Sequence, residues 1–243
     1  MLRTGYANIP HAEKSATGGE DSWFITEEVI GVADGVGGMS KMGVDCKMFS
    51  NNLCEFCEQG VNARQMVNPE RIAIYAFSKV SVNGASTLLV VNGENPNKVE
   101  YYNIGDSQVG IYRSSHGWIH VSPEQEHDFN QPYQLGRMDT FTADRPDAGI
   151  TNSIDTQKGD ILVVASDGLW DNVYLNVIRD LIDEELKGGY YDEGELALRL
   201  AQEAWYSASR HEDTPFSDRA MTHGYSLPGG KPDDITVLVS TII

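Results

Sequence analysis

The feature that most constrains this chain is a series of short runs of β-branched and aromatic residues separated by tight turns. Four such runs, over residues 86–91, 99–104, 109–113 and 118–121, follow one another in the middle of the sequence. The turns between them contain the pairs NG, GD and HG, which favour sharp reversals of the chain. We therefore expect four consecutive strands that form an antiparallel meander.

Apolar residues at helical spacing are found on both sides of this block. A first helix is expected from near Val44 to Gly60, where the glycine would end it. A second helix is expected to open at Asn68 and Pro69, which suit the N-cap and the first helical position. The other expected elements are two helices over 174–186 and 192–208, two strands joined by a two-Glu turn over 23–33, strands over 160–165 and 235–243, and polar loops over 125–153 and 209–232.

The order of these elements predicts the class of fold. Two blocks of strands with helices grouped in pairs favour an α+β sandwich, with the sheets inside and the helices outside. No repeat, low-complexity tract or linker rich in proline and serine divides the 243 residues. We therefore expect a single domain over 1–243, in which the 40% of hydrophobic residues supply a sizeable core.

Charge and cysteine content exclude several classes of protein. The sequence has 36 acidic and 18 basic residues, a formal net charge of −18, which argues against binding to nucleic acid or to anionic membranes. Its apolar runs are far shorter than the roughly 18 residues of a membrane span, and no signal-peptide core is visible. Three cysteines cannot form a disulfide framework, and the C-x-x-C of Cys54 and Cys57 lacks the second pair of a zinc site. We expect reduced thiols in an intracellular, reducing compartment.

Acidic residues lie beside glycine or proline at the ends of predicted strands in five places. They are Glu20-Asp21, Asp34, Asp106, Asp167 and Asp233-Asp234. Any one of them taken alone is normally just a turn. Because the strands of a sheet end together, five such places can converge, and the carboxylates would then repel one another unless a cation neutralised them. Oxygen ligands without Cys or His favour Mg²⁺ or Mn²⁺.

Six motifs, in this order along the chain, resemble those of the metal-dependent type-2C protein phosphatases. They are GEDSWF, GVADGVGG, GASTLLVV, NIGDSQVGIY, LVVASDGLWDN and KPDDITVLVS, and they cover nearly the whole sequence. The segments EQEHDFNQPYQL and GGKPDDITVL resemble the compact branch typified by the mitochondrial members. No P-loop, Ser-His-Asp or Cys-x₅-Arg pattern competes with this interpretation.

This resemblance implies a fold and an activity. The fold is a β-sandwich of two antiparallel sheets flanked by pairs of helices. The activity is hydrolysis of phosphoserine and phosphothreonine in proteins by a water or hydroxide that bridges two Mn²⁺ or Mg²⁺ ions, without a covalent intermediate. We accordingly expect a phosphoprotein substrate, a monomer, and a mitochondrial location.

The resemblance also implies the metal ligands and the catalytic groups. Asp34 would bridge both ions, the carbonyl of Gly35 would bind one of them, and Asp167 and Asp233 would complete the ligand set. Asp34 and Asp167 would act in catalysis through the bound metal and water. Asp234 then occupies a place where the family has asparagine.

Further acids would support this centre. Glu20 and Asp21 would hold metal-bound waters, and Asp106 together with Asp167 could hold a third ion.

The sequence departs from the family pattern in two places. Val36 stands where many members have a histidine proposed to protonate the leaving group. The phosphate-binding arginine that many members place before the first acidic pair is missing, and Lys14 is the best substitute, although a solvated lysine is the alternative. These departures leave two other functions open: a weakly active or inactive phosphoprotein-binding regulatory domain, and a phosphatase of a small phosphorylated metabolite.

Overall fold

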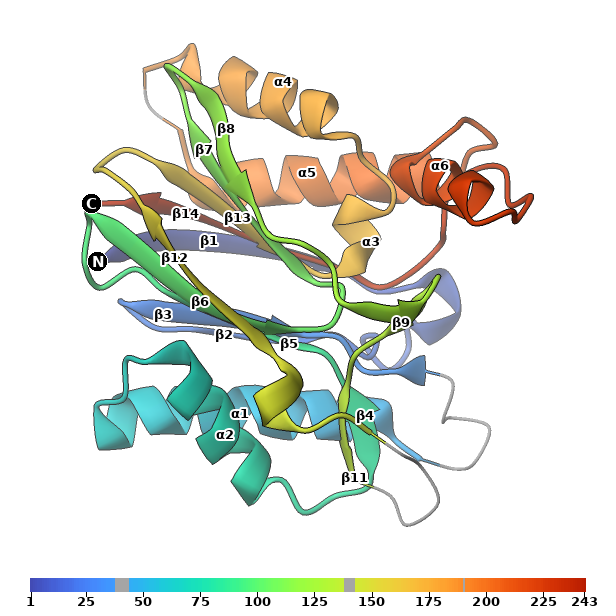
Figure 1. Cartoon of the computed structure of the whole chain (residues 1–243). Helices are drawn as coiled ribbons and strands as arrows, with labels where there is room; N and C mark the ends of the chain where they lie inside the picture. The colour runs from blue at the N-terminus through green and yellow to red at the C-terminus, as the bar shows by residue number, and fades with distance from the viewer. Residues whose placement is uncertain (38–43, 138–142, 190) are drawn as a thin grey trace.

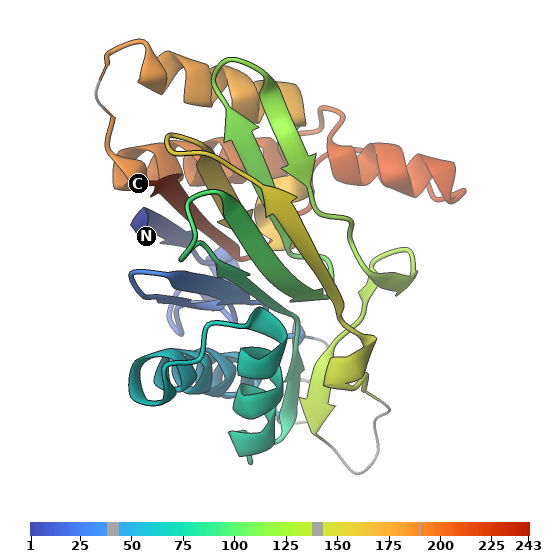
Figure 2. The ribbon, with the colours of Figure 1, turned by 60° about the vertical axis from the view of Figure 1, so that its left-hand side comes forward.

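The structure is a computed structural model that describes residues 1–37, 44–137, 143–189 and 191–243. Two five-stranded antiparallel sheets pack face to face at its centre, and a pair of helices covers the outer face of each (Figures 1 and 2). The two ends of the chain lie side by side, because the first and last strands pair with Leu2 opposite Ile242. The predicted α+β sandwich is confirmed.

The first sheet is covered by α4 (Leu175–Leu186) and α5 (Glu193–Ala208). Its strands, in spatial order, are β1 (Leu2–Ile9), β14 (Ile235–Ile242), β13 (Ile161–Ala165), β7 (Gln108–Arg113) and β8 (Gly117–Val121).

The second sheet is covered by α1 (Cys46–Arg64) and α2 (Pro69–Lys79). As predicted, the side chain of Asn68 caps α2 by accepting a hydrogen bond from the Arg71 backbone at 3.0 Å. The strands of this sheet, in spatial order, are β12 (Ile150–Asp155), β6 (Lys98–Ile104), β5 (Leu88–Asn92), β3 (Val29–Ala33) and β2 (Ser22–Ile25).

The described residues also form shorter elements. They are the helices α3 (Asp167–Trp170) and α6 (Pro215–Thr222), the paired strands β4 (Gly84–Ser86) and β11 (Leu135–Arg137), the paired strands β9 (Glu126–Asp128) and β10 (Gln131–Pro132), and single 3₁₀ turns at Ala12–Lys14 and Pro146–Ala148. Within the described residues no helix has both the length and the apolar character needed to cross a membrane.

The core forms three layers because the central strands are buried on both faces. In β13, Leu162 and Val164 point between the two sheets, whereas Ile161 and Val163 point toward the outer helices. Side chains alternate between the faces of a strand, so a strand buried on both sides is an unbroken apolar run. The sequence ILVVA of β13 is such a run.

The predicted meander is wrong at its centre. Strands β5 and β6 pair in one sheet and β7 and β8 in the other, so the chain changes sheets over residues 105–107. Gly105 makes this crossing possible with a φ of +117°. A tight turn within a sheet and a crossing between sheets use the same turn residues, so the local pattern does not separate them.

Three other expectations also need correction. Gly60 does not end the first helix: α1 continues to Arg64, and the glycine gives close packing, since a Cβ there would lie 3.1 Å from the Tyr75 ring. The loop expected over 209–232 contains α6, and the one over 125–153 contains several short strands. Strand β1 was not expected, because the apolar residues in its sequence LRTGYANI do not alternate regularly with polar ones; it is held by pairing with β14.

Candidate metal centre

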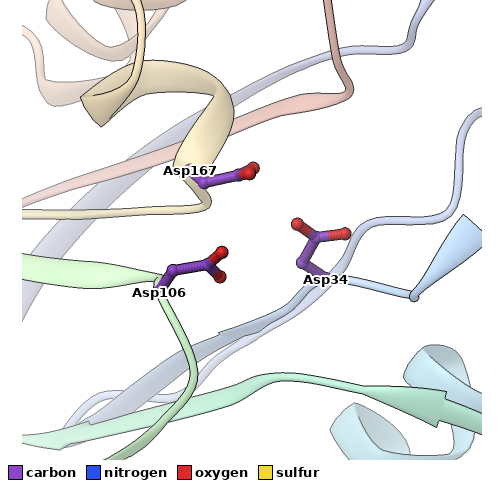
Figure 3. A group of neighbouring side chains, drawn as sticks. All are labelled: Asp34, Asp106 and Asp167. Carbon is purple, nitrogen blue, oxygen red and sulfur yellow. The ribbon is translucent and has the colours of Figure 1, made fainter. Parts of the chain in front are cut away.

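Three of the predicted carboxylates meet at one end of the sandwich. Asp34 directly follows β3, Asp106 lies two residues after the end of β6, and Asp167 begins α3 two residues after the end of β13. One oxygen from each of the three lies within 4.8 Å of the others (Figure 3). The point where the chain crosses between the sheets therefore brings Asp106 to the other two acids.

Close packing of the backbone holds this arrangement. A Cβ on Gly105 would lie 2.5 Å from a methyl carbon of Thr87, and one on Gly35 would lie 2.8 Å from the carbonyl oxygen of Glu20. Thr87 fixes Asp34 twice: its hydroxyl accepts from the Asp34 backbone N–H at 3.1 Å, and its own N–H donates to the Asp34 carbonyl at 2.9 Å. These two positions beside the acids therefore require glycine, because other segments of the same chain pack too closely against them to leave room for a side chain.

Asp21 approaches the same cluster from the second sheet and is fully buried. Its Oδ2 accepts a hydrogen bond of 2.7 Å from the hydroxyl of Ser166, the residue before Asp167. Burial, with the negative charge of Asp234, raises the pKa of Asp21 to about 6. Ser166 occupies the N-cap position of α3.

The chemistry of this donor set fits a hard divalent cation. Among the described residues, Asp21, Asp106 and Asp167 each have a buried Oδ1 without a hydrogen-bond partner. Burial, reinforced by the neighbouring carboxylates, raises the pKa values of Asp34 and Asp106 well above the ordinary range. Unpaired carboxylates in a low-dielectric site are costly, and a cation with several oxygen ligands removes both the repulsion and the missing contacts.

Asp233 lies at the edge of the cluster, next to a cation that the sequence analysis missed. Lys231 Nζ donates hydrogen bonds to Asp167 and, at 2.8 Å, to Asp171, and lies 3.4 Å from Asp233 Oδ2. Burial and the charge of Asp167 raise the pKa of Asp233 to about 7. The signal for Lys231 was present, since it stands two residues before a predicted ligand.

Lys231 and Asp167 hold each other in their charged forms. Burial alone would raise the pKa of Asp167, but the ammonium beside it keeps that pKa below its usual value. Burial would lower the pKa of Lys231, but Asp167 and Asp171 hold it well above its usual value. The charged lysine is therefore a fixed feature of this end of the sandwich.

A second lysine, Lys14, forms ion pairs with two other acids of the predicted set. Lys14 Nζ lies 2.5 Å from Glu20 Oε2 and 3.2 Å from Asp234 Oδ2. Asp234 also accepts hydrogen bonds from the backbone N–H groups of Glu20, at 2.8 Å, and His11, at 2.7 Å. Asp234 thus ties the N-terminal segment to the cluster, and a phosphate contact of Lys14 stays a prediction.

Val36 is held against the helix that follows it. Its N–H donates to the carbonyl of Ala85 at 3.0 Å, and its own carbonyl accepts from Cys46 Sγ at 2.9 Å. Its side chain is partly buried and packs on the apolar pair Cys46 and Ala85. The position that many type-2C phosphatases give to histidine is a packing position in this chain.

No protein-family model matches the chain, but individual proteins do. The probable protein phosphatase 2C 80 of Arabidopsis thaliana is 34% identical over 247 residues, which cover 99% of this chain and 58% of that protein. The protein phosphatase PTC7 homolog of Xenopus laevis is 36% identical, with 92% of this chain and 81% of the relative covered. The PTC7 homolog of Homo sapiens is 35% identical, with 95% and 81% covered. The chain thus spans little more than half the length of the first of these relatives.

Solved structures share the same architecture. The photosystem II phosphatase PBCP superposes with a TM-score of 0.92 at 27% identity, covering 100% of this chain and 99% of the other. The catalytic domain of the serine/threonine protein phosphatase PstP, solved in complex with two manganese ions, has a TM-score of 0.63 at 16% identity, covering 100% and 98%. At that lower identity the second match speaks for the fold alone.

Proposed function

The chain belongs to the protein phosphatase 2C family, and from this premise we propose that it hydrolyses phosphoserine and phosphothreonine in proteins with bound divalent metal ions. The observation that carries the proposal is the group formed by Asp34, Asp106 and Asp167, whose oxygens converge within 4.8 Å. Unpaired buried oxygens on Asp106 and Asp167 support it, because most buried polar atoms are hydrogen-bonded and a bound cation would supply the missing contact.

We propose that the first pair of ions is held by Asp34, the carbonyl of Gly35, Asp167 and Asp233. When bound, Mn²⁺ or Mg²⁺ supplies a nucleophilic water at neutral pH and offsets the charge on the phosphoryl oxygens. The carboxylates of Asp34 and Asp167 would act by holding the ions and, through them, the water in position. No covalent phosphoenzyme would be formed.

Three other acids would act around that set. Glu20 and Asp21 approach it from the second sheet, where they would hold water. Asp106 would share a third ion with Asp167. Lys14 would contact the substrate phosphate, since its ammonium is paired with Glu20 beside the cluster and its side chain is one-third exposed, at 33%.

The domain organisation, the oligomeric state and the location of the protein are proposed on the same premise. Residues 1–243 would form a single catalytic domain that acts as a monomer on phosphoproteins. The resemblance of EQEHDFNQPYQL and GGKPDDITVL to the mitochondrial branch supports a mitochondrial location. A regulatory domain without turnover is less well supported, because binding alone gives no reason to keep unpaired carboxylates converging.

One assay tests the activity. The protein is incubated with p-nitrophenyl phosphate and with a phosphothreonine peptide, in Mn²⁺ and in EDTA. We expect turnover of both in Mn²⁺ and none in EDTA. Turnover that survives EDTA, or none at saturating Mn²⁺, would contradict the proposed function, and turnover of small phosphate esters without the peptide would favour a metabolite phosphatase.

A further inference from the structure

Lys231 is tightly held at the edge of the acidic cluster. Its backbone N–H donates to Asn172 Oδ1 at 2.8 Å, and its carbonyl accepts from Asn172 Nδ2 at 2.9 Å. Its side chain is 17% exposed and bonds Asp167 and Asp171 at once. Both ends of the residue are therefore fixed, so the ammonium cannot move far from Asp167.

The partner on the other side of the ammonium is fixed as well. Asp171 is 2% exposed and accepts a hydrogen bond of 2.8 Å from Arg219. Arg219 in turn pairs with Glu124 at 2.6 Å. Positive and negative groups thus alternate from Asp167 outward, and Asp171 draws Lys231 away from the cluster while Asp167 draws it in.

We propose that Lys231 is a positioning residue: a built-in counter-ion that shares Asp167 with the divalent ions and sets how tightly they bind. The inference rests on the proposed metal centre. An ion bound to the unpaired Oδ1 of Asp167 shares that carboxylate with the ammonium on Oδ2, and it meets the repulsion of a fixed positive charge. In the metal-free protein the same ammonium lowers the cost of keeping Asp167 and Asp233 together.

This role predicts two changes of opposite sign. Lys231→Gln removes the charge but can still hydrogen-bond, so the dissociation constant for Mn²⁺ should fall by at least about tenfold, because the repulsion between a dication and a unit charge about 6 Å apart is worth that factor even at the dielectric of water, about 80. Asp171→Asn removes the competing carboxylate and leaves the ammonium to Asp167, so the dissociation constant should rise by about three- to tenfold. A merely structural role would weaken binding in both variants.

Two controls separate charge from packing. Lys231→Arg keeps the positive charge and should bind Mn²⁺ within about twofold of the wild type, since the guanidinium can bond two carboxylates. Arg113→Gln breaks another ion pair to a buried aspartate, Asp160, at the far end of the same sheet. It should lower the unfolding midpoint without changing the Mn²⁺ affinity.

The measurement is calorimetric titration of the EDTA-stripped and dialysed full chain with Mn²⁺, together with a thermal melt of each variant. Tighter binding by Lys231→Gln and weaker binding by Asp171→Asn would support the proposal. No binding by the wild type would overturn the metal centre, and this inference with it. Wild-type binding with an equal or weaker Lys231→Gln would overturn the inference alone. If that variant failed to fold, Asp171→Asn would decide, because equal or tighter binding there would also overturn it.

Discussion

Strand β13 has a buried aspartate at each end, and the two have different surroundings. Asp160 precedes the strand, and its two oxygens accept hydrogen bonds of 2.7 and 2.6 Å from Arg113. Asp167 follows the strand, faces Asp34 and Asp106, and has an Oδ1 without a partner among the described residues. The two side chains are nearly equally buried, at 1% and 8% exposure. What distinguishes them is therefore the pairing of their oxygens.

This difference separates an acid that stabilises the fold from one that can bind metal. Asp160 has no free site for a ligand, since its Oδ2 also accepts from the backbone N–H of Gln157 at 2.9 Å. In Asp167 the Oδ1 atom is still free to accept a contact. A buried oxygen without a hydrogen bond is costly, so a ligand that supplies the missing contact would be favoured there.

The largest effect is expected at the metal end. Asp34→Asn, Asp167→Asn and Asp233→Asn each remove a negative charge from a proposed ligand. Loss of a group that only supports a ligand costs about 10- to 100-fold, so loss of a ligand should lower turnover by roughly 100-fold or more. Steady-state kinetics at saturating Mn²⁺ measure this, with circular dichroism to verify the fold. A turnover number close to that of the wild type in any two of the three would contradict the metal assignment.

The matched change at the other end should act on stability. Asp160→Asn leaves Arg113 without its carboxylate and removes one acceptor, so the unfolding midpoint should fall. The turnover number of the folded fraction should stay within about twofold of the wild type, because the site lies at the opposite end of the strand. Urea unfolding and kinetics on the same sample give both values. A loss of turnover as large as that of Asp167→Asn would remove the distinction between the two acids.

Bound metal should stabilise the fold through Asp167 and not through Asp160. A ligand present at about 100 times its dissociation constant adds about 2.7 kcal/mol if it binds only the native state. Thermal melts in millimolar Mn²⁺ and in EDTA should differ for the wild type and by a similar amount for Asp160→Asn. The difference should largely disappear in Asp167→Asn. An unchanged midpoint for the wild type would mean that the acids at the strand ends serve only as turns.

The contrast between Asp160 and Asp167 could not be predicted from the sequence. Local patterns identify β13, α2 and the acids that end the strands, because periodicity and capping are short-range properties. The partners that decide each acid's role lie 47 residues away for Asp160 and 64 for Asp167. The sheet crossing at Gly105 is likewise decided by packing of distant segments. The motif KPDDITVLVS contained Lys231, but only the fold shows which acids it faces.

The smallest effect is expected at Val36, two residues after Asp34. Its backbone is held by Ala85 and Cys46, and its side chain packs on the same two residues. A histidine there must enter a partly apolar contact, so Val36→His should lower the unfolding midpoint by a small amount. It should leave unchanged the ratio of rates for an aryl and an alkyl phosphate, because an imidazole that does not reach the leaving group cannot protonate it. If the variant narrowed that ratio, the side chain would have turned toward the carboxylates, and the packing seen here would not govern the position.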